Sequence, residues 1–131
     1  MTARPEPLVL VVEDSDAIRA AFTILLEESG YAVAAAANGE EAVRLAGERA
    51  PDLVLLDLGL PDISGLDVAR RIKSDPATAR IPLVALTGRD DALDRDALLA
   101  AGCAAYLIKP VDTQALIRAL PTYIAGGSPV G

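Results

Sequence analysis

The chain has 131 residues, 52% of them hydrophobic, with one cysteine, no histidine and a formal net charge of −7. This length is typical of a single domain, and the longest apolar runs, about seven residues, are far below the ~18 that a membrane span needs. The acidic balance argues against nucleic-acid binding, and the lack of histidine excludes histidine ligands and histidine acid-base chemistry. With one cysteine and no signal-peptide pattern, the composition predicts a cytoplasmic protein without an internal disulfide.

Five uninterrupted apolar stretches alternate with five segments of helical spacing. The apolar stretches predict buried strands over residues 8–12, 31–37, 53–56, 81–86 and 104–108. The helical segments run from Ile18 to Gly30, from Asn38 to about Arg49, from Ser64 to the turn at Asp75, from Asp90 or Asp91 to Ala101, and from Asp112 onward. We expect residues 1–7 to form a flexible lead-in, residues 8–125 the domain, and residues 126–131 a flexible tail.

Local signals mark several helix ends. Asn38 and Ser64 each precede an acidic residue three positions later, as in an N-terminal capping box. Gly102 is expected to terminate the fourth helix. Pro121 falls inside the apolar spacing of the last helix, so a kink or break is expected there.

Strands that are apolar throughout and separated by helices indicate an all-parallel sheet covered on both faces. The predicted fold is α/β: a flavodoxin-like, doubly wound, five-stranded parallel sheet in the order 2-1-3-4-5 with five helices. In such sheets, ligands bind beyond the carboxyl ends of the strands, where the strand order reverses.

Polar side chains stand at four of these strand ends. Glu13 and Asp14 follow the first strand, Asp57 the third, Thr87 the fourth and Lys109 the fifth. Each alone is usually a cap, turn or surface residue, but their joint occurrence points to one site. Three carboxylates and one ammonium sum to −2, which a divalent cation would neutralise, and oxygen ligands favour Mg²⁺. Asp14 and Asp57 would bind the ion directly, and Glu13 through water.

The same strand ends predict phosphoryl chemistry. Asp57 could attack a phosphoryl group bridged to it by the metal and become an aspartyl phosphate. The Thr87 hydroxyl, the Gly88 amide and the Lys109 ammonium would then bind phosphoryl oxygens. Cys103 is interpreted as a small packing residue.

The segments VVEDS, LLDLGLPDISG, ALTG and YLIKP carry these residues, and with them the chain resembles the receiver domains of two-component response regulators over residues 8–124. The resemblance implies phosphotransfer to Asp57 from a phosphohistidine of a sensor histidine kinase or histidine phosphotransfer protein. We expect Mg²⁺ at Asp14, Asp57 and the Gly59 carbonyl, and the resemblance implies a cis peptide bond before Pro110. Such a domain is not an enzyme in the usual sense, since it catalyses only phosphotransfer onto its own aspartate and the subsequent hydrolysis.

The resemblance also implies a conformational switch. Thr87 would move toward the phosphoryl group and Tyr106 would turn inward behind it, which re-shapes the face of the fourth helix, fifth strand and fifth helix for a downstream protein target. Direct contact with nucleic acid or membrane is not expected. Gly59 and Arg89 stand at two positions flanking the pocket that tune the phosphoryl lifetime in the family.

Several alternatives stay open from the sequence. The chain is either a stand-alone receiver or a receiver fragment of a hybrid kinase or longer regulator. A phosphate-independent pseudo-receiver is disfavoured because every chemical group is present. A flavin or nucleotide binder is disfavoured because the loop VEDSD would repel phosphate.

Overall fold

The computed structural model describes residues 6–88 and 92–126, and within them it confirms the predicted fold. The sheet has the order β2-β1-β3-β4-β5 with all neighbouring strands parallel. The strands are β1 (Leu8–Val12), β2 (Ala32–Ala36), β3 (Leu53–Asp57), β4 (Leu83–Thr87) and β5 (Ala105–Ile108). The helices are α1 (Asp16–Glu28), α2 (Gly39–Arg49), α3 (Gly65–Ser74), α4 (Ala92–Ala100) and α5 (Thr113–Ile124). The expectations for residues 1–5 and 127–131 and for a cap at Asp90 or Asp91 lie outside the described residues.

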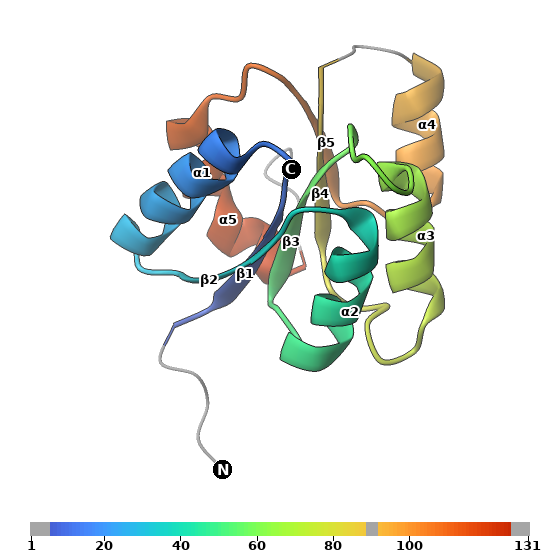
Figure 1. The fold of residues 1–131 in the computed structure, drawn as a ribbon, viewed down its shortest axis with the longest axis horizontal. Coiled ribbons are helices and arrows are strands. Elements are labelled where there is room, and N and C mark those ends of the chain that lie inside the picture. The colour runs from blue at the N-terminus through green and yellow to red at the C-terminus, as the bar shows by residue number, and fades with distance from the viewer. Residues whose placement is uncertain (1–5, 89–91, 127–131) are drawn as a thin grey trace.

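The helices cover the sheet in two layers (Figure 1). α1 and α5 lie on one face, and α2, α3 and α4 lie on the other. Successive side chains of a strand point to opposite faces, so each inner strand contributes to two cores. In β1, Leu8, Leu10 and Val12 pack on the side of α2, α3 and α4, while Val9 and Val11 pack on the side of α1 and α5. Burial on both faces explains why β1 contains only apolar residues.

Four helices begin at a side chain that caps the first turn. Ser15, Asn38, Ser64 and Asp112 each accept a hydrogen bond from an amide three residues later, at the starts of α1, α2, α3 and α5. These contacts satisfy amides that have no partner inside the helix. The starts predicted at Asn38, Ser64 and Asp112 are therefore confirmed.

α4 ends where the sequence predicted, at Gly102, whose φ of 103° is unfavourable for other residues. The next amide, that of Cys103, donates to the Leu98 carbonyl at 3.0 Å, which is the pattern of a Schellman motif. α1 ends in the same motif at Gly30, with the Tyr31 amide as donor. Because the Tyr31 amide donates to the Leu26 carbonyl in this motif, β2 begins at Ala32, one residue later than predicted.

The predicted start of β4 at Ile81 was wrong. The Ile81 amide donates to the Thr78 carbonyl at 3.0 Å, and the Ile81 carbonyl accepts from Lys73 Nζ at 2.7 Å. Both backbone groups are thus committed to the turn after α3. Pairing of β4 with β3 begins two residues later, at Leu83.

α5 continues through Pro121, so of the kink or break predicted there, the break was wrong. Proline removes one backbone donor from a helix interior. Leu120 and Tyr123 are nevertheless buried beside it, with 0% and 4% of their surface exposed, and the Ala125 amide donates to the Pro121 carbonyl at 3.1 Å. Packing of the last turn against the sheet therefore outweighs the lost hydrogen bond.

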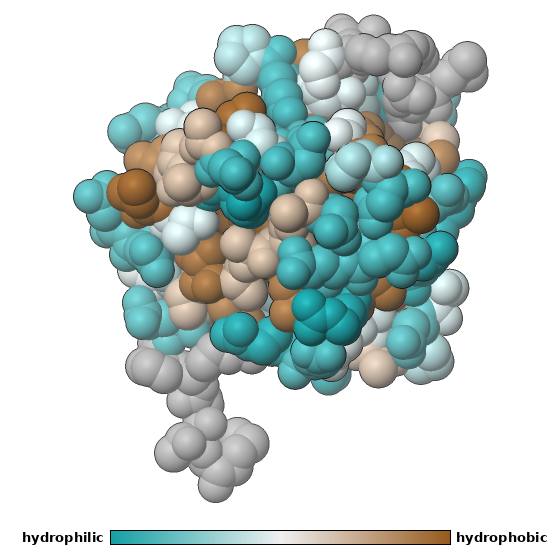
Figure 2. All heavy atoms as spheres, in the orientation of Figure 1, coloured by the Kyte–Doolittle hydropathy of each residue, from teal (hydrophilic) through white to brown (hydrophobic). Residues whose placement is uncertain are grey.

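The outer surface over α2 and α3 carries mostly hydrophilic side chains (Figure 2). Arg71 of α3 reaches Glu40 of α2 at 3.1 Å, and both side chains are exposed. Exposed pairs of this kind contribute at most about 1 kcal/mol, so the two apolar cores carry most of the stability. Along residues 6–88 and 92–126, none of the helices combines the length and the apolar character needed to cross a membrane.

Candidate functional site

The four strand ends singled out in the sequence meet at one edge of the sheet. Asp57 and Thr87 are the last residues of β3 and β4, and Glu13 and Lys109 directly follow β1 and β5. Backbone bonds continue past these ends, since the Lys109 amide donates to the Thr87 carbonyl at 2.7 Å and the Glu13 amide to the Ala36 carbonyl at 3.0 Å. The site therefore lies at the carboxyl edge, where the strand order reverses between β1 and β3.

Three carboxylates converge there. Glu13, Asp14 and Asp57 each offer one oxygen, and these oxygens lie within 4.8 Å of one another. Glu13 and Asp57 are buried, with 3% and 5% of their surface exposed, whereas Asp14 is exposed. Neighbouring buried carboxylates are costly unless a cation or a proton compensates them. An all-oxygen set with one ligand facing solvent fits Mg²⁺, which keeps several of its waters when bound to protein.

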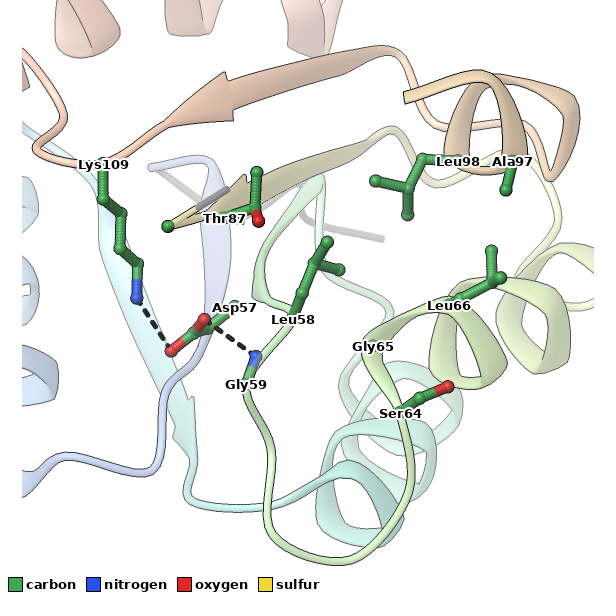
Figure 3. A pocket seen from close by; sticks show the side chains of 11 residues that line it. Asp57, Leu58, Gly59, Ser64, Gly65, Leu66, Thr87, Ala97, Leu98 and Lys109 are labelled. Carbon is green, nitrogen blue, oxygen red and sulfur yellow. Dashed lines mark hydrogen bonds and ion pairs between the residues drawn. The ribbon is translucent and has the colours of Figure 1, made fainter. Parts of the chain in front are cut away.

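Lys109 supplies part of this compensation. Its Nζ lies 3.0 Å from Asp57 Oδ2 and 3.6 Å from Glu13 Oε1. The Gly59 amide donates to Asp57 Oδ1 at 3.1 Å, so each oxygen of Asp57 faces a donor (Figure 3). Asp57 is therefore oriented by two groups: the Lys109 ammonium, which follows β5, and the Gly59 amide, in the loop between β3 and α3.

The pKa values of the two buried carboxylates move in opposite directions. Burial, followed by the neighbouring Asp57, raises the pKa of Glu13 to about 7. Burial also opposes ionisation of Asp57, but the Gly59 amide, Glu13 and Lys109 together outweigh it and hold the pKa of Asp57 below its usual range. In the metal-free protein, the pair therefore takes up its proton on Glu13, and Asp57 remains a carboxylate.

A cavity of about 630 Å³ opens beside Asp57. Its polar side is formed by Asp57, Thr87, Gly88 and Lys109, and its other side is largely apolar and comes from α3 and α4 (Figure 3). Thr87 is itself buried, with 5% of its surface exposed. The structure thus brings together all four residues for which the sequence predicted phosphoryl contacts.

Tyr106 is not among the residues that line this cavity. It sits on β5 opposite Ala85 of β4, is half-buried, and packs against the core on the side of α2, α3 and α4. The guanidinium of Arg95, on α4, lies 5.9 Å from the centre of its ring, within the range of a cation–π contact. The peptide bond between Lys109 and Pro110 is cis, as expected. Arg89 lies outside the described residues.

Cys103 takes no part in the site. It is buried, with 6% of its surface exposed, and burial raises the pKa of its thiol to about 11. A thiol with so high a pKa is a poor nucleophile at neutral pH. Its interpretation as a packing residue is therefore consistent with the structure.

Sequence reasoning missed Asp62, in the loop between β3 and α3. Its carboxylate accepts hydrogen bonds from the amides of Gly39 and Glu40, at 2.8 and 2.9 Å. These partners precede it by 23 and 22 residues, so no local pattern reveals the contact. The loop that contains Gly59 is tied to the start of α2 in this way.

The family comparison agrees with the fold and the site. The model of the response regulator receiver domain matches residues 9–121, and the chain belongs to this family. It is therefore a receiver domain of two-component signalling, with an acidic cluster compatible with a Mg²⁺ site.

Two curated relatives differ in how much of their length is matched. The transcriptional regulatory protein AfsQ1 of Streptomyces coelicolor is 42% identical over 110 residues, which cover 84% of this chain and 48% of AfsQ1. The polar-differentiation response regulator DivK of Brucella anthropi is 37% identical over 116 residues, covering 88% of this chain and 94% of DivK. The chain thus spans about half of the first relative and nearly all of the second.

Solved structures show the same architecture. The receiver domain of a sensor histidine kinase from Pseudomonas aeruginosa PAO1, solved with a magnesium ion coordinated in its active-site cleft, is 33% identical with a TM-score of 0.83. The alignment covers 92% of this chain and 98% of that one. A two-component response regulator of the LuxR family from Aurantimonas is 30% identical with a TM-score of 0.84, covering 94% of this chain and 88% of that one.

Proposed function

We propose that this receiver domain accepts a phosphoryl group on Asp57 from a phosphohistidine, with Mg²⁺ as its cofactor. The observation that carries the proposal is the state of Asp57. It is 5% exposed, its pKa is held below the usual range, and Gly59 and Lys109 orient it at the wall of the cavity. A buried carboxylate that stays ionised is an available nucleophile.

Glu13, Asp14 and Asp57 are the residues that would hold Mg²⁺, together with the Gly59 carbonyl. When bound, the ion neutralises the carboxylate cluster and supplies positive charge to phosphoryl oxygens. The 4.8 Å limit on the separation of the carboxylate oxygens supports this assignment. The magnesium ion in the related Pseudomonas aeruginosa receiver supports it independently.

In the proposed transfer, an oxygen of Asp57 forms a bond to phosphorus while the phosphorus–nitrogen bond of the donor breaks. The imidazole nitrogen keeps the electron pair and takes a proton. Lys109 would neutralise charge on one phosphoryl oxygen, and the Thr87 hydroxyl and Gly88 amide would donate hydrogen bonds to others. Their place on the cavity wall beside Asp57 supports these roles.

The test is phosphorylation by acetyl phosphate or phosphoramidate, followed by intact-protein mass spectrometry. Wild type is expected to gain one phosphoryl group in Mg²⁺ and none in EDTA, and Asp57→Asn none in either. Asp67→Asn, which removes an exposed carboxylate of α3, is the matched control and should behave like wild type. A phosphate-independent receiver would be shown by an unmodified wild type, and another acceptor by a modified Asp57→Asn.

We further propose that Thr87 couples phosphorylation to Tyr106 and to the face made by α4, β5 and α5, which would contact a downstream protein. Thr87→Ala should still accept a phosphoryl group, on the order of 100-fold more slowly, because Asp57 and the metal ligands remain. The NMR signals of the Tyr106 ring should then stay near their unmodified positions when beryllofluoride is bound. Thr87→Ser, which keeps the hydroxyl, should restore the shift. Equal Tyr106 shifts in wild type and Thr87→Ala would contradict the coupling.

The proposed phosphodonor is a sensor histidine kinase or a histidine phosphotransfer protein, and the proposed domain comprises residues 8–125. Both a stand-alone receiver and a receiver within a longer protein agree with the relatives, since the matched segment makes up 94% of DivK and 48% of AfsQ1. The site chemistry proposed above is the same in either case.

A further inference from the structure

The loop between β3 and α3 is attached to α2, a helix that comes earlier in the sequence and is not adjacent to the loop in the chain. Asp62, near the middle of this loop, places its two carboxylate oxygens on two consecutive amides of α2: Oδ1 lies 2.8 Å from the Gly39 nitrogen, and Oδ2 lies 2.9 Å from the Glu40 nitrogen. These amides, the Glu40 amide first, hold the pKa of Asp62 near 2, so the carboxylate is charged at neutral pH. Both oxygens of one side chain are thus occupied by backbone donors.

The neighbouring residue reinforces the same attachment. Ile63 packs so closely on Gly39 that a Cβ at position 39 would lie 2.3 Å from Ile63 Cγ1. Glycine at the start of α2 is therefore what lets the loop approach. Asp62 and Ile63 together bind the loop to α2 through a polar and an apolar contact.

Capping alone does not account for Asp62. The start of α2 already has a cap within its own segment, because Asn38 Oδ1 accepts from the Glu41 amide at 2.8 Å. Asn38 precedes α2 directly, whereas Asp62 belongs to the loop that leaves the phosphoacceptor strand. The second pair of hydrogen bonds fixes the loop as much as it fixes the helix.

The same loop carries Gly59, whose amide donates to Asp57 Oδ1 at 3.1 Å. Gly59 is exposed and has no side chain to hold it in place, so its position depends on the path of the loop around it. Between Gly59 and the start of α3, Asp62 provides the polar anchor to a rigid element.

We propose that Asp62 is a positioning residue: by tying the loop to α2, it holds Gly59 in the place from which the amide orients Asp57 and the carbonyl can reach Mg²⁺. This inference rests on the proposed function. Groups that support metal ligands from outside the ligand set typically change metal affinity by about 10–100-fold when removed. Asp62 acts through Gly59 and touches neither the ion nor the phosphoryl group.

The first readout needs no metal. In EDTA, ¹⁵N relaxation should show a lower order parameter for the Gly59 amide in Asp62→Ala than in wild type. Asp62→Asn keeps one acceptor oxygen and should give an intermediate value. Asn38→Ala is the matched control: it removes a cap from the same end of α2 without touching the loop, and should leave the Gly59 amide rigid.

The second readout is Mg²⁺ itself, followed by NMR titration with MgCl₂. Asp62→Ala should raise the apparent dissociation constant about tenfold, with Asp62→Asn between it and wild type and Asn38→Ala unchanged. With acetyl phosphate, Asp62→Ala should need about tenfold more Mg²⁺ for half-maximal rate and recover most of the wild-type rate at saturating Mg²⁺.

Equal Mg²⁺ affinity in Asp62→Ala and wild type would overturn the inference. Equal losses in Asp62→Ala and Asn38→Ala would also overturn it, because they would show a general effect of α2 stability. Failure of wild type to bind Mg²⁺ or accept a phosphoryl group would overturn the proposed function instead, while Gly59 mobility in EDTA still tests Asp62.

Discussion

In EDTA, raising the pH from about 4.5 to 8 should shift the difference in free energy of unfolding between Glu13→Gln and wild type by on the order of 2 kcal/mol in favour of the variant. Burial and the neighbouring Asp57 raise the pKa of Glu13 from 4.5 to about 7, so the folded protein must ionise this group at a cost that the unfolded chain does not bear. A tenfold change in proton affinity corresponds to about 1.4 kcal/mol, and solvent that reaches the site screens the charges and lowers the expected total. Glutamine keeps the shape and cannot ionise.

The sign follows from proton binding. Between pH 4.5 and about pH 7, the folded state holds a proton on Glu13 that the unfolded state has lost, so wild-type stability is fully present below this window and falls as pH rises through it. The pKa of Asp57 is shifted below 3.8, so the stability that its ionised form contributes is lost only as the pH falls below 3.8. That range lies outside the interval from pH 4.5 to about pH 7. The pH dependence measured between these limits therefore belongs mainly to Glu13.

Urea melts of both proteins at several pH values test this. Parallel stability curves for wild type and Glu13→Gln would show that Glu13 ionises as freely in the fold as in water. Excess Mg²⁺ should narrow or reverse the difference at pH 8, because binding stabilises the folded wild type and the variant has lost one of the proposed ligand carboxylates.

Gly65→Ala should lower the free energy of unfolding by about 2–3 kcal/mol. Gly65 opens α3 directly after the loop that follows Asp57, and a Cβ there would lie 2.7 Å from Leu58 Cα and 3.2 Å from the Asp57 carbonyl oxygen. Both are backbone atoms of the segment leaving β3, so they cannot move aside as a flexible side chain would. The strain falls mainly on Leu58, the residue directly after Asp57, so under the proposed function phosphorylation should slow as well.

Gly47→Ala is the matched control for this substitution. Gly47 lies inside α2, and a Cβ there would have no atom within 4 Å, so the change should raise stability by roughly 0.5–1 kcal/mol through the better helix propensity of alanine. Thermal melts of the two variants beside wild type give the comparison. If Gly65→Ala were as stable as Gly47→Ala, the close approach of α3 to Leu58 would not be a feature of the folded protein.

The parallel, doubly covered sheet was predictable because strands buried on both faces are apolar throughout, as β1 is, and the strand order followed from the rules for right-handed crossovers in doubly wound sheets. The boundary predictions were wrong where tertiary contacts, which no sequence pattern reveals, decide the structure. Ile81 reads as a strand residue, yet Lys73 and Thr78 take up its carbonyl and amide. Pro121 reads as a helix breaker, yet the buried Tyr123 beyond it keeps the turn in place.

For the site, the residue types and their positions at the carboxyl ends of the strands were sufficient to predict that Asp57, Thr87 and Lys109 lie together. Which of the two buried carboxylates carries the proton was not predictable, since it depends on distances of a few ångströms. Lys109 lies 3.0 Å from Asp57 and 3.6 Å from Glu13, and this asymmetry helps to keep Asp57 ionised while Glu13 takes up the proton. The role of Asp62 was not predicted for a related reason, because its hydrogen-bond partners are more than 20 residues away in the sequence.

The groups at the carboxyl edge come from positions spread over most of the chain, with Glu13 at one end and Lys109 at the other. A ribosome-bound chain therefore exposes its acidic residues long before the lysine that pairs with them has been made. Until β5 docks beside β4, such a chain has Asp57 without the cation that pairs with it, and the cavity lacks Lys109. Under the proposed function, a chain that has not yet formed β5 would lack the positive charge that Lys109 supplies to the phosphoryl group, so its Asp57 should be a poor phosphoacceptor.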